Sequence, residues 1–184
     1  TDYTQVDHLP THGRRVVFQG VEGAYSFGAM KEFFDDTITS FHVDTWKEAM
    51  EAITKGEADY AVLPIENSTA GIVSDIYDLL VEYPHYIVGE QELPVEHVLM
   101  ALPGAKVEDI RTVISHPQAL AQCRRFLDSN ENWKTEERLN TAAAAKEVSE
   151  SGDLTMAAVG SPYAAEHFGL QILKEGIFDA RDNT

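Results

Sequence analysis

Short apolar runs alternate with segments of helical periodicity along most of this chain. Each apolar run leads into a polar turn, and the turn is followed by apolar residues spaced three or four positions apart. This alternation predicts an α/β fold with a largely parallel arrangement of strands and helices on the sheet faces. We expect strands at 16–18, 38–43, 60–63, 112–114, 134–139, 156–159 and 170–173, and helices at 24–34, 45–55, 71–83, 117–127, 141–149 and 162–167.

The segment 86–102 departs from this alternation. It is long and rich in β-forming residues, and Pro94 interrupts it. We interpret it as a crossing between two small lobes, with the chain returning to the first lobe near Leu170. The expected division is a linker or tail at 1–14, a first lobe at 15–95 and 170–184, and a second lobe at 96–169. Mixed, mostly parallel sheets flanked by helices would then enclose an active-site cleft between the lobes.

The strand-to-helix corners share one chemistry. They are rich in small residues, hydroxyls and amides, and none contains Lys or Arg. Small residues let a ligand approach the backbone, and helix-start N–H groups hold anions. Converging corners would therefore bind a small dicarboxylate, although Ser, Thr and Asn are also the ordinary caps of helices, and each corner alone leaves both interpretations open. The corners are 20–26, 66–71, 115–118, 140–143 and 160–162.

The acidic composition excludes several classes of partner. The chain has 31 acidic and 14 basic residues and a net charge of −17, whereas nucleic acids and anionic membranes require a basic surface. No apolar run approaches the roughly 20 residues of a membrane helix, and the polar amino terminus does not resemble a secretory signal. Cys123 is the single cysteine. We therefore expect no nucleic-acid partner, no membrane contact and a cytoplasmic location.

Other chemistries fit the sequence poorly. It contains no nucleotide phosphate loop, no zinc-ligand spacing and no nucleophile elbow. His8 and His12 stand four apart, but Pro10 lies between them, so no metal site is expected. Cys123 lies within an apolar helical pattern and is interpreted as a core residue. The remaining histidines outside the corners are interpreted as structural or solvated; they are His42, His85, His97 and His167.

Four sequence segments, taken in order, resemble the prephenate dehydratase family. They are 18–26 (FQGVEGAYS), 58–68 (ADYAVLPIENS), 115–123 (SHPQALAQC) and 141–143 (TAA). The resemblance covers residues 15 to 184. It implies a fold like that of type II periplasmic binding proteins, with the active site between the lobes. It also implies conversion of prephenate to phenylpyruvate, water and carbon dioxide in phenylalanine biosynthesis, with no metal or organic cofactor.

The resemblance also implies roles for individual residues. Thr184 would donate a proton or hydrogen bond to the leaving hydroxyl group, and Glu66 would orient its neighbours or assist proton transfer. Asn67 would orient the substrate as a third member of the catalytic group. Gln122 follows Ser115 by seven residues, about two helical turns, so both side chains can face one cleft. The expected substrate-binding residues are Ala24, Ser26, Ser68, Ser115, His116, Gln122, Thr141 and Ala142.

The chain departs from the family pattern at its end. The family carries a Thr-Arg-Phe signature, and here the sequence reads Asp182-Asn183-Thr184 and stops. We expect a piece of a larger protein, cut inside this motif. The resemblance implies a following ACT domain, through which phenylalanine would act, in some bacteria a preceding chorismate mutase domain, and a possible homodimer. Arogenate dehydratase and a non-catalytic two-lobed protein that binds small carboxylates remain the alternatives.

Overall fold

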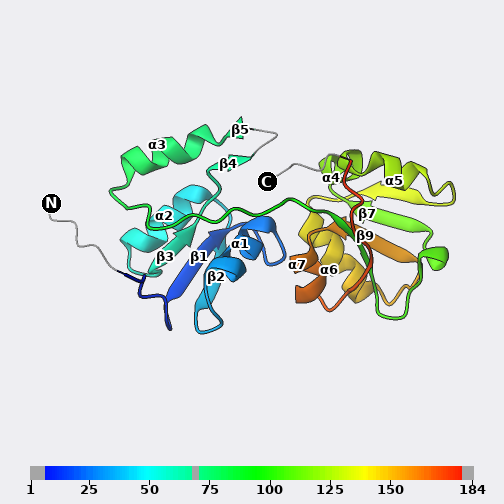
Figure 1. The fold of residues 1–184 in the computed structure, drawn as a ribbon, viewed down its shortest axis with the longest axis horizontal. Coiled ribbons are helices and arrows are strands. Elements are labelled where there is room, and N and C mark those ends of the chain that lie inside the picture. The colour runs from blue at the N-terminus through cyan, green and yellow to red at the C-terminus, as the bar shows by residue number, and fades with distance from the viewer. Residues whose placement is uncertain (1–6, 68–70, 180–184) are drawn as a thin grey trace.

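The computed structural model describes residues 7–67 and 71–179, which form two α/β lobes (Figure 1). The first lobe contains a parallel sheet in the order β2-β1-β3. Side chains alternate along β1: Val16 and Phe18 pack on one face and Val17 on the other, so helices cover both faces. The elements are β1 (Arg15–Gln19), α1 (Tyr25–Phe33), β2 (Thr39–Val43), α2 (Trp46–Thr54), β3 (Tyr60–Val62) and α3 (Ser74–Glu82).

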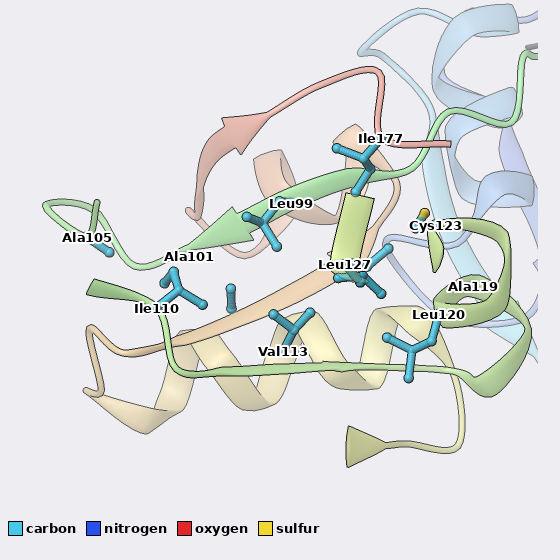
Figure 2. Close-up of a cluster of buried hydrophobic side chains, with 12 residues drawn as sticks. Leu99, Ala101, Ala105, Ile110, Val113, Ala119, Leu120, Cys123, Leu127 and Ile177 are labelled. Carbon is cyan, nitrogen blue, oxygen red and sulfur yellow. The ribbon is translucent and has the colours of Figure 1, made fainter. Parts of the chain in front are cut away.

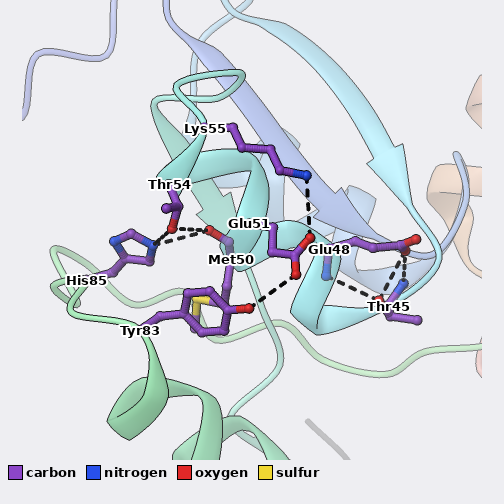
Figure 3. Close-up of polar contacts among 8 residues, drawn as sticks. All are labelled: Thr45, Glu48, Met50, Glu51, Thr54, Lys55, Tyr83 and His85. Atoms are coloured by element: carbon purple, nitrogen blue, oxygen red, sulfur yellow. Dashed lines mark hydrogen bonds and ion pairs between the residues drawn. The ribbon is translucent and has the colours of Figure 1, made fainter.

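Helix α2 begins as the sequence predicts. The hydroxyl of Thr45 accepts from the Glu48 N–H at 3.2 Å, and the Glu48 carboxylate accepts from the Thr45 N–H at 2.9 Å. This is the capping box, and it satisfies donors that a helix start otherwise leaves unpaired (Figure 3).

The corner after β3 differs from the expectation. A helix was expected from Gly71, but the chain first forms a short antiparallel hairpin of β4 (Glu66–Asn67) and β5 (Gly71–Ile72). Gly71 adopts a φ of 82°, which is not helical and which favours glycine. Helix α3 therefore begins only at Ser74, and Glu66 and Asn67 lie on a hairpin rather than in a simple strand-to-helix turn.

The connector between the lobes is the second correction. Residues 84–97 form no regular element, and only β6 (Val98–Ala101) of the expected β-rich stretch is a strand. The connector is anchored on α2 at its start. His85 Nε2 lies 3.0 Å from the Thr54 hydroxyl, and the Tyr83 hydroxyl donates to Glu51 at 3.4 Å (Figure 3). It then runs from the first lobe to the second, as expected (Figure 1).

The second lobe contains a five-stranded mixed sheet in the order β10-β6-β9-β7-β8. Strands β7, β8 and β9 are parallel, whereas β6 is antiparallel to both β9 and β10. Leu99, Val113 and Leu127 belong to the apolar cluster on one face (Figure 2). The elements that follow β6 are η1 (Val107–Asp109), β7 (Thr112–Ser115), α4 (Pro117–Gln122), α5 (Arg124–Asp128), β8 (Lys134–Glu137), α6 (Thr141–Ser151), β9 (Met156–Gly160), α7 (Pro162–His167) and β10 (Gln171–Lys174).

Two further expectations need correction in this lobe. The helix expected over 117–127 is divided at Cys123, whose ψ of 19° separates α4 from α5; Cys123 is fully buried, as a core residue should be (Figure 2). Residues 170–179 do not return to the first lobe. Strand β10 pairs with β6, and Ile172 and Ile177 pack in the two apolar clusters of the second lobe, so pairing and apolar burial hold this segment there.

The α/β class, the two lobes and the mostly parallel strands are confirmed. Among the described residues, no helix is both long enough and apolar enough to cross a bilayer.

Candidate active site

Sheet topology brings several corners of the second lobe to one edge. Strands β7, β8 and β9 are parallel, so their carboxyl ends point the same way. Antiparallel β6 begins at this edge, because Val98 is paired with Gly160 at the end of β9. The edge therefore carries the residue before β6 and the corners after β7, β8 and β9, which is where ligands bind in open α/β sheets.

The first corner of the other lobe meets this edge directly. The buried Ser161 hydroxyl donates to the Gly23 carbonyl at 2.7 Å and accepts from the Ala164 N–H at 3.1 Å. Gly23 has a φ of 92°, and a Cβ at this position would lie 3.0 Å from the Ala164 Cα. Only glycine satisfies both the backbone conformation and the close approach. We call these contacts, together with those between α1 and α7, the lobe interface.

A buried histidine joins three elements in the lobe interface. His97, the residue before β6, is 4% exposed. Its Nδ1 lies 3.1 Å from the hydroxyl of Tyr25, the first residue of α1, and its Nε2 lies 2.9 Å from Oε1 of Gln122, the last residue of α4. The Tyr25 and Phe178 rings pack against the imidazole, with centroids 5.9 and 5.3 Å away. We call Tyr25, His97 and Gln122 the interlobe relay.

The interlobe relay is neutral at physiological pH. Burial lowers the pKa of His97 and outweighs the Gln122 hydrogen bond, which acts in the opposite direction. Burial is also the main cause that raises the pKa of Tyr25 far above its usual range. A neutral imidazole has one N–H and one acceptor nitrogen. Because Gln122 offers an oxygen, Nε2 carries the proton and donates to Gln122, and Nδ1 accepts from the Tyr25 hydroxyl.

His97 and Tyr25 were not predicted as site residues from the sequence. His97 was interpreted as structural or solvated, and Tyr25 lay inside a matched segment without an assigned role. The signal that could have found His97 is its position, since it immediately precedes an apolar strand. That signal does not by itself separate a site residue from a core residue.

The segment after β10 returns to the interlobe relay. The Asp179 N–H donates to the Gln122 carbonyl at 2.8 Å, and its carboxylate accepts from the Arg125 N–H at 3.4 Å. With Phe178 against His97, the described chain ends beside Gln122. Thr184, expected to be the proton donor, follows five residues later and lies outside the described residues, as does Ser68.

Three predicted binding residues have side chains that already hold the fold. The Ser115 hydroxyl is fully buried and donates to the Val159 carbonyl at 2.6 Å, which ties β7 to β9. The Ser26 hydroxyl donates to the Gln19 carbonyl at 2.6 Å. His116 caps α4, because its Nδ1 accepts from the Gln118 N–H at 3.0 Å. Each retains a hydrogen-bonding capacity, but its first partner is structural.

Two helix starts differ in how their N–H groups are satisfied. Ala24 is the N-cap of α1 and supplies no side-chain hydrogen bond to the helix start. Asn140 caps α6, since its Oδ1 accepts from the Ala143 N–H at 2.7 Å, ahead of Thr141 and Ala142. Thr141 faces Gly160, where an added Cβ would lie 3.4 Å from the Thr141 Cβ.

The hairpin that carries Glu66 and Asn67 follows β3. Because β3 is parallel to β1, the hairpin and the corner after β1 leave the first sheet at the same edge. Glu66 is exposed and Asn67 is half-buried. Topology thus places these residues on the side of the first sheet that carries Ala24, whereas Ser115, Thr141 and Gln122 lie on the second lobe.

Two hollows in the surface lie away from this group. One of about 130 Å³ lies between α1 and α7 and is lined by Phe27, Lys31, Tyr163, Glu166 and His167. Another, of about 570 Å³, lies on the second lobe alone, beside Lys146 and Glu147. Neither contains a predicted site residue, so the expected active-site cleft remains a prediction. Among the described residues, no cluster of His, Cys, Asp and Glu could hold a metal ion.

The comparisons with known proteins identify the family. The model of the prephenate dehydratase family matches residues 16–184. The chain belongs to the prephenate dehydratase family. It is 43% identical over 183 residues to arogenate dehydratase 1 of Petunia hybrida, an alignment that covers 98% of this chain and 43% of the relative. This chain thus spans less than half the length of that curated relative.

Solved structures show the same fold. A structure titled as GqqA, a novel type of quorum quenching acylase, superposes with a TM-score of 0.80 at 38% identity, covering 91% of this chain and 60% of that one. A prephenate dehydratase from Arthrobacter aurescens in complex with L-Phe has a TM-score of 0.75 at 31% identity, covering 91% of this chain and 57% of that one.

Proposed function

We propose that this chain is the catalytic domain of a prephenate dehydratase. The reaction removes the ring carboxylate as carbon dioxide, and the electron pair of the broken C–C bond enters the ring. The C–O bond to the ring hydroxyl breaks at the same time, and one proton converts the departing hydroxide to water. Aromatisation supplies the driving force, so the enzyme must hold a dianion and supply that proton.

The observation that carries the proposal is the direct contact between corners of the two lobes. Ser161 on the second lobe bonds to Gly23 on the first, one residue before Ala24. A ligand at this point would meet residues from both lobes, as a substrate with two separated carboxylates requires. Membership of the family supports the same assignment.

Backbone dipoles are proposed to hold the carboxylates. The start of α1 has no side-chain cap, so its first N–H groups remain available to a carboxylate. Thr141 and the Ala142 N–H at the start of α6 would hold the other, because the Ala143 N–H is already bonded to Asn140 Oδ1. A net charge of −17 repels an anion at long range, so attraction must come from such local donors.

The proton donor is proposed to be Thr184, as the family resemblance implies. Within the interlobe relay, the Tyr25 hydroxyl is already hydrogen-bonded to His97, and burial lowers the pKa of His97, so that the ring holds no extra proton to give near neutral pH. A threonine hydroxyl is a weak acid, and most of the acceleration would therefore come from positioning and electrostatic preorganisation. The described chain ends with Asp179 bonded to Gln122, which is consistent with a donor that follows a few residues later.

Glu66 and Asn67 are proposed to orient the substrate from the β4–β5 hairpin. Four further residues are proposed to contribute to substrate binding: Ser26, Ser68, Ser115 and His116. Ser26, Ser115 and His116 would do so in addition to the structural hydrogen bonds that their side chains make. Ala142 is buried at 2% exposure, so its contribution would be its backbone N–H.

Arogenate is the alternative substrate, because the Petunia relative is named an arogenate dehydratase. Arogenate carries an ammonium group where prephenate has a ketone. An exposed carboxylate such as Glu66 would suit that ammonium group. A preference for arogenate that disappears in Glu66→Gln would favour this alternative.

An acylase of the nucleophile type finds little support in the described residues. Burial raises the pKa of the Cys123 thiol to about 12, so the thiolate is not formed near neutral pH. Both nitrogens of His97 are taken by Tyr25 and Gln122 rather than by a serine hydroxyl.

The test is turnover by the full-length protein. Prephenate and arogenate are supplied separately, and phenylpyruvate and phenylalanine are measured as products. We expect phenylpyruvate from prephenate, with loss of at least about 10²-fold in Thr184→Val and partial retention in Thr184→Ser. Binding of prephenate without turnover would instead identify a non-catalytic carboxylate-binding protein. A homodimer and a cytoplasmic location also remain predictions, to be tested by light scattering and by cell fractionation.

A further inference from the structure

The interlobe relay uses its polar atoms differently from the other buried polar side chains. Among the described residues these are His97, Ser115 and Ser161. The two serines donate to backbone carbonyls and so fasten the fold. His97 instead contacts two side chains, one on each lobe. Burying an imidazole between aromatic rings is costly compared with an apolar residue, so packing alone does not account for it.

The directions of the hydrogen bonds in the interlobe relay are set by Gln122 and Tyr25 together. The Gln122 side chain turns its oxygen toward Nε2 at 2.9 Å, so neutral His97 carries its proton on Nε2 and leaves Nδ1 as an acceptor. The Tyr25 hydroxyl, which can donate or accept, then donates to Nδ1 at 3.1 Å and stabilises this tautomer. The same orientation of the Gln122 side chain turns its NH₂ group away from the imidazole. A histidine with the other tautomer would demand the opposite orientation of this amide.

We propose that His97 is a positioning residue, which fixes Gln122 as a hydrogen-bond donor to the substrate and makes that orientation depend on Tyr25 of the first lobe. The inference rests on the proposed function, in which Gln122 contacts the substrate. As a consequence, the Gln122 NH₂ group faces the substrate only when α1 and α4 are both packed around His97. The correct arrangement of the two lobes is then also the condition for the correct orientation of Gln122.

The tautomer can be measured without turnover. ¹⁵N-histidine NMR of the full-length protein should show neutral His97 with the proton on Nε2 at pH 7.5, and His97→Phe assigns the signal. In Tyr25→Phe, the signal should shift toward the other tautomer or toward a mixture. A wild-type ring protonated on Nδ1, or one unaffected by Tyr25→Phe, would overturn the proposal whatever the reaction catalysed.

Kinetics supply a matched pair of substitutions. The Gln side chain in His97→Gln can place an amide N–H near the position of Nε2, whereas the Asn side chain in His97→Asn reaches only the position of Nδ1. We expect His97→Asn to lower kcat by about 10- to 100-fold, mainly without raising KM, and His97→Gln to recover most of it. Tyr25→Phe should also lower kcat. Equal losses in both His97 variants, in proportion to lost thermal stability, would show a merely structural role.

Tyr163→Phe is the control for the lobe interface. The Tyr163 hydroxyl donates to Glu32 at 3.0 Å between α7 and α1, so its hydrogen bond lies outside the interlobe relay. Its removal should leave kcat within about twofold of wild type. Failure of the wild type to convert prephenate or arogenate would refute the proposed function and leave the NMR prediction to decide the orientation of Gln122.

Discussion

Two tyrosines cross the lobe interface, and their surroundings differ. The Tyr25 hydroxyl meets a buried neutral imidazole, which in turn fixes an amide. The Tyr163 hydroxyl meets the Glu32 carboxylate in contact with solvent. In water a hydroxyl–carboxylate bond competes with hydration, whereas a buried partner that is left unpaired costs about 1–3 kcal/mol. Burial therefore determines which of the two hydrogen bonds can control geometry.

The largest expected effect comes from replacing the donor itself. In Gln122→Glu, an oxygen remains to accept from His97 Nε2–H, but the NH₂ group is lost and a negative charge faces a dianionic substrate. Loss of one preorganised donor costs about 10²–10³-fold in kcat, and we expect at least this in steady-state kinetics of the full-length protein. Glu32→Gln, which alters the partner of Tyr163, is the matched control and should leave kcat near the wild-type value. Activity retained in Gln122→Glu would remove Gln122 as a donor.

The next effect concerns the contact that brings the lobes together. Gly23→Ala places a Cβ 3.0 Å from the Ala164 Cα at a φ of 92°. Overpacking and the left-handed backbone together should lower the free energy of unfolding by about 1–3 kcal/mol or more. The measurement is urea unfolding followed by circular dichroism. Gly104→Ala, where the φ of 93° matches that of Gly23 but no atom lies within 4 Å of the added Cβ, separates backbone strain from packing. Equal losses in the two variants would show that the close approach to Ala164 does not matter.

The sequence predicted local structure better than the connections between elements. Alternation of apolar runs and helical segments predicted the strands of the two main sheets except β6, which lies inside the irregular segment 86–102, and the spacing of Thr45 and Glu48 predicted a capping box. It could not assign β10 to a lobe, because Ile172 offers the same apolar side chain to either sheet and only pairing with β6 decides. The turn at Gly71 was missed for a related reason, since a two-residue strand has too few positions for a period.

The candidate site was predicted only in part, because local sequence patterns do not show contacts between distant residues. Small and hydroxylated residues indicate the strand-to-helix corners, so the corners that contain Ser161, Ala24 and Thr141 could be predicted from the sequence. His97 was not, because its role depends on two partners 72 and 25 positions away. Ser115 was visible, but its hydroxyl is used to tie β7 to β9, which a sequence pattern cannot distinguish from a ligand contact.

A smaller effect should appear in the pH dependence of stability. Because burial lowers the pKa of His97 below 6.5 in the folded state, the unfolded chain binds its proton first as pH falls. The contribution of neutral His97 to the free energy of unfolding is therefore fully present above pH 6.5. It decreases as pH falls toward the pKa of His97 in the folded state, by at most about 1.4 kcal/mol per pH unit.

The measurement for this prediction is the difference in melting temperature between wild type and His97→Gln from pH 8 to 5. The lowered pKa values of Glu22 and Asp59 place those carboxylates below this range, since they start from 4.5 and 3.8. The other histidines are present in both proteins, so their effect on the melting temperature cancels in the difference between wild type and His97→Gln. The wild type should lose more stability than the variant as pH falls, and parallel curves would contradict a buried, neutral His97.

The smallest expected effect is that of Tyr163→Phe, and its smallness is informative. The ring fills the space beside Gly28, where an added Cβ would lie 2.5 Å from it, and Phe preserves this packing. Burial, followed by the hydrogen bond to Glu32, raises the pKa of Tyr163 to about 12, so the group lost is a neutral hydroxyl. An exposed hydrogen bond of this kind should change the free energy of unfolding by less than about 0.5 kcal/mol, measured by urea unfolding. If Tyr163→Phe lowered kcat as strongly as Tyr25→Phe, any loosening of the lobe interface would suffice to disturb the site. Burial of His97 would then no longer explain the difference between the two tyrosines.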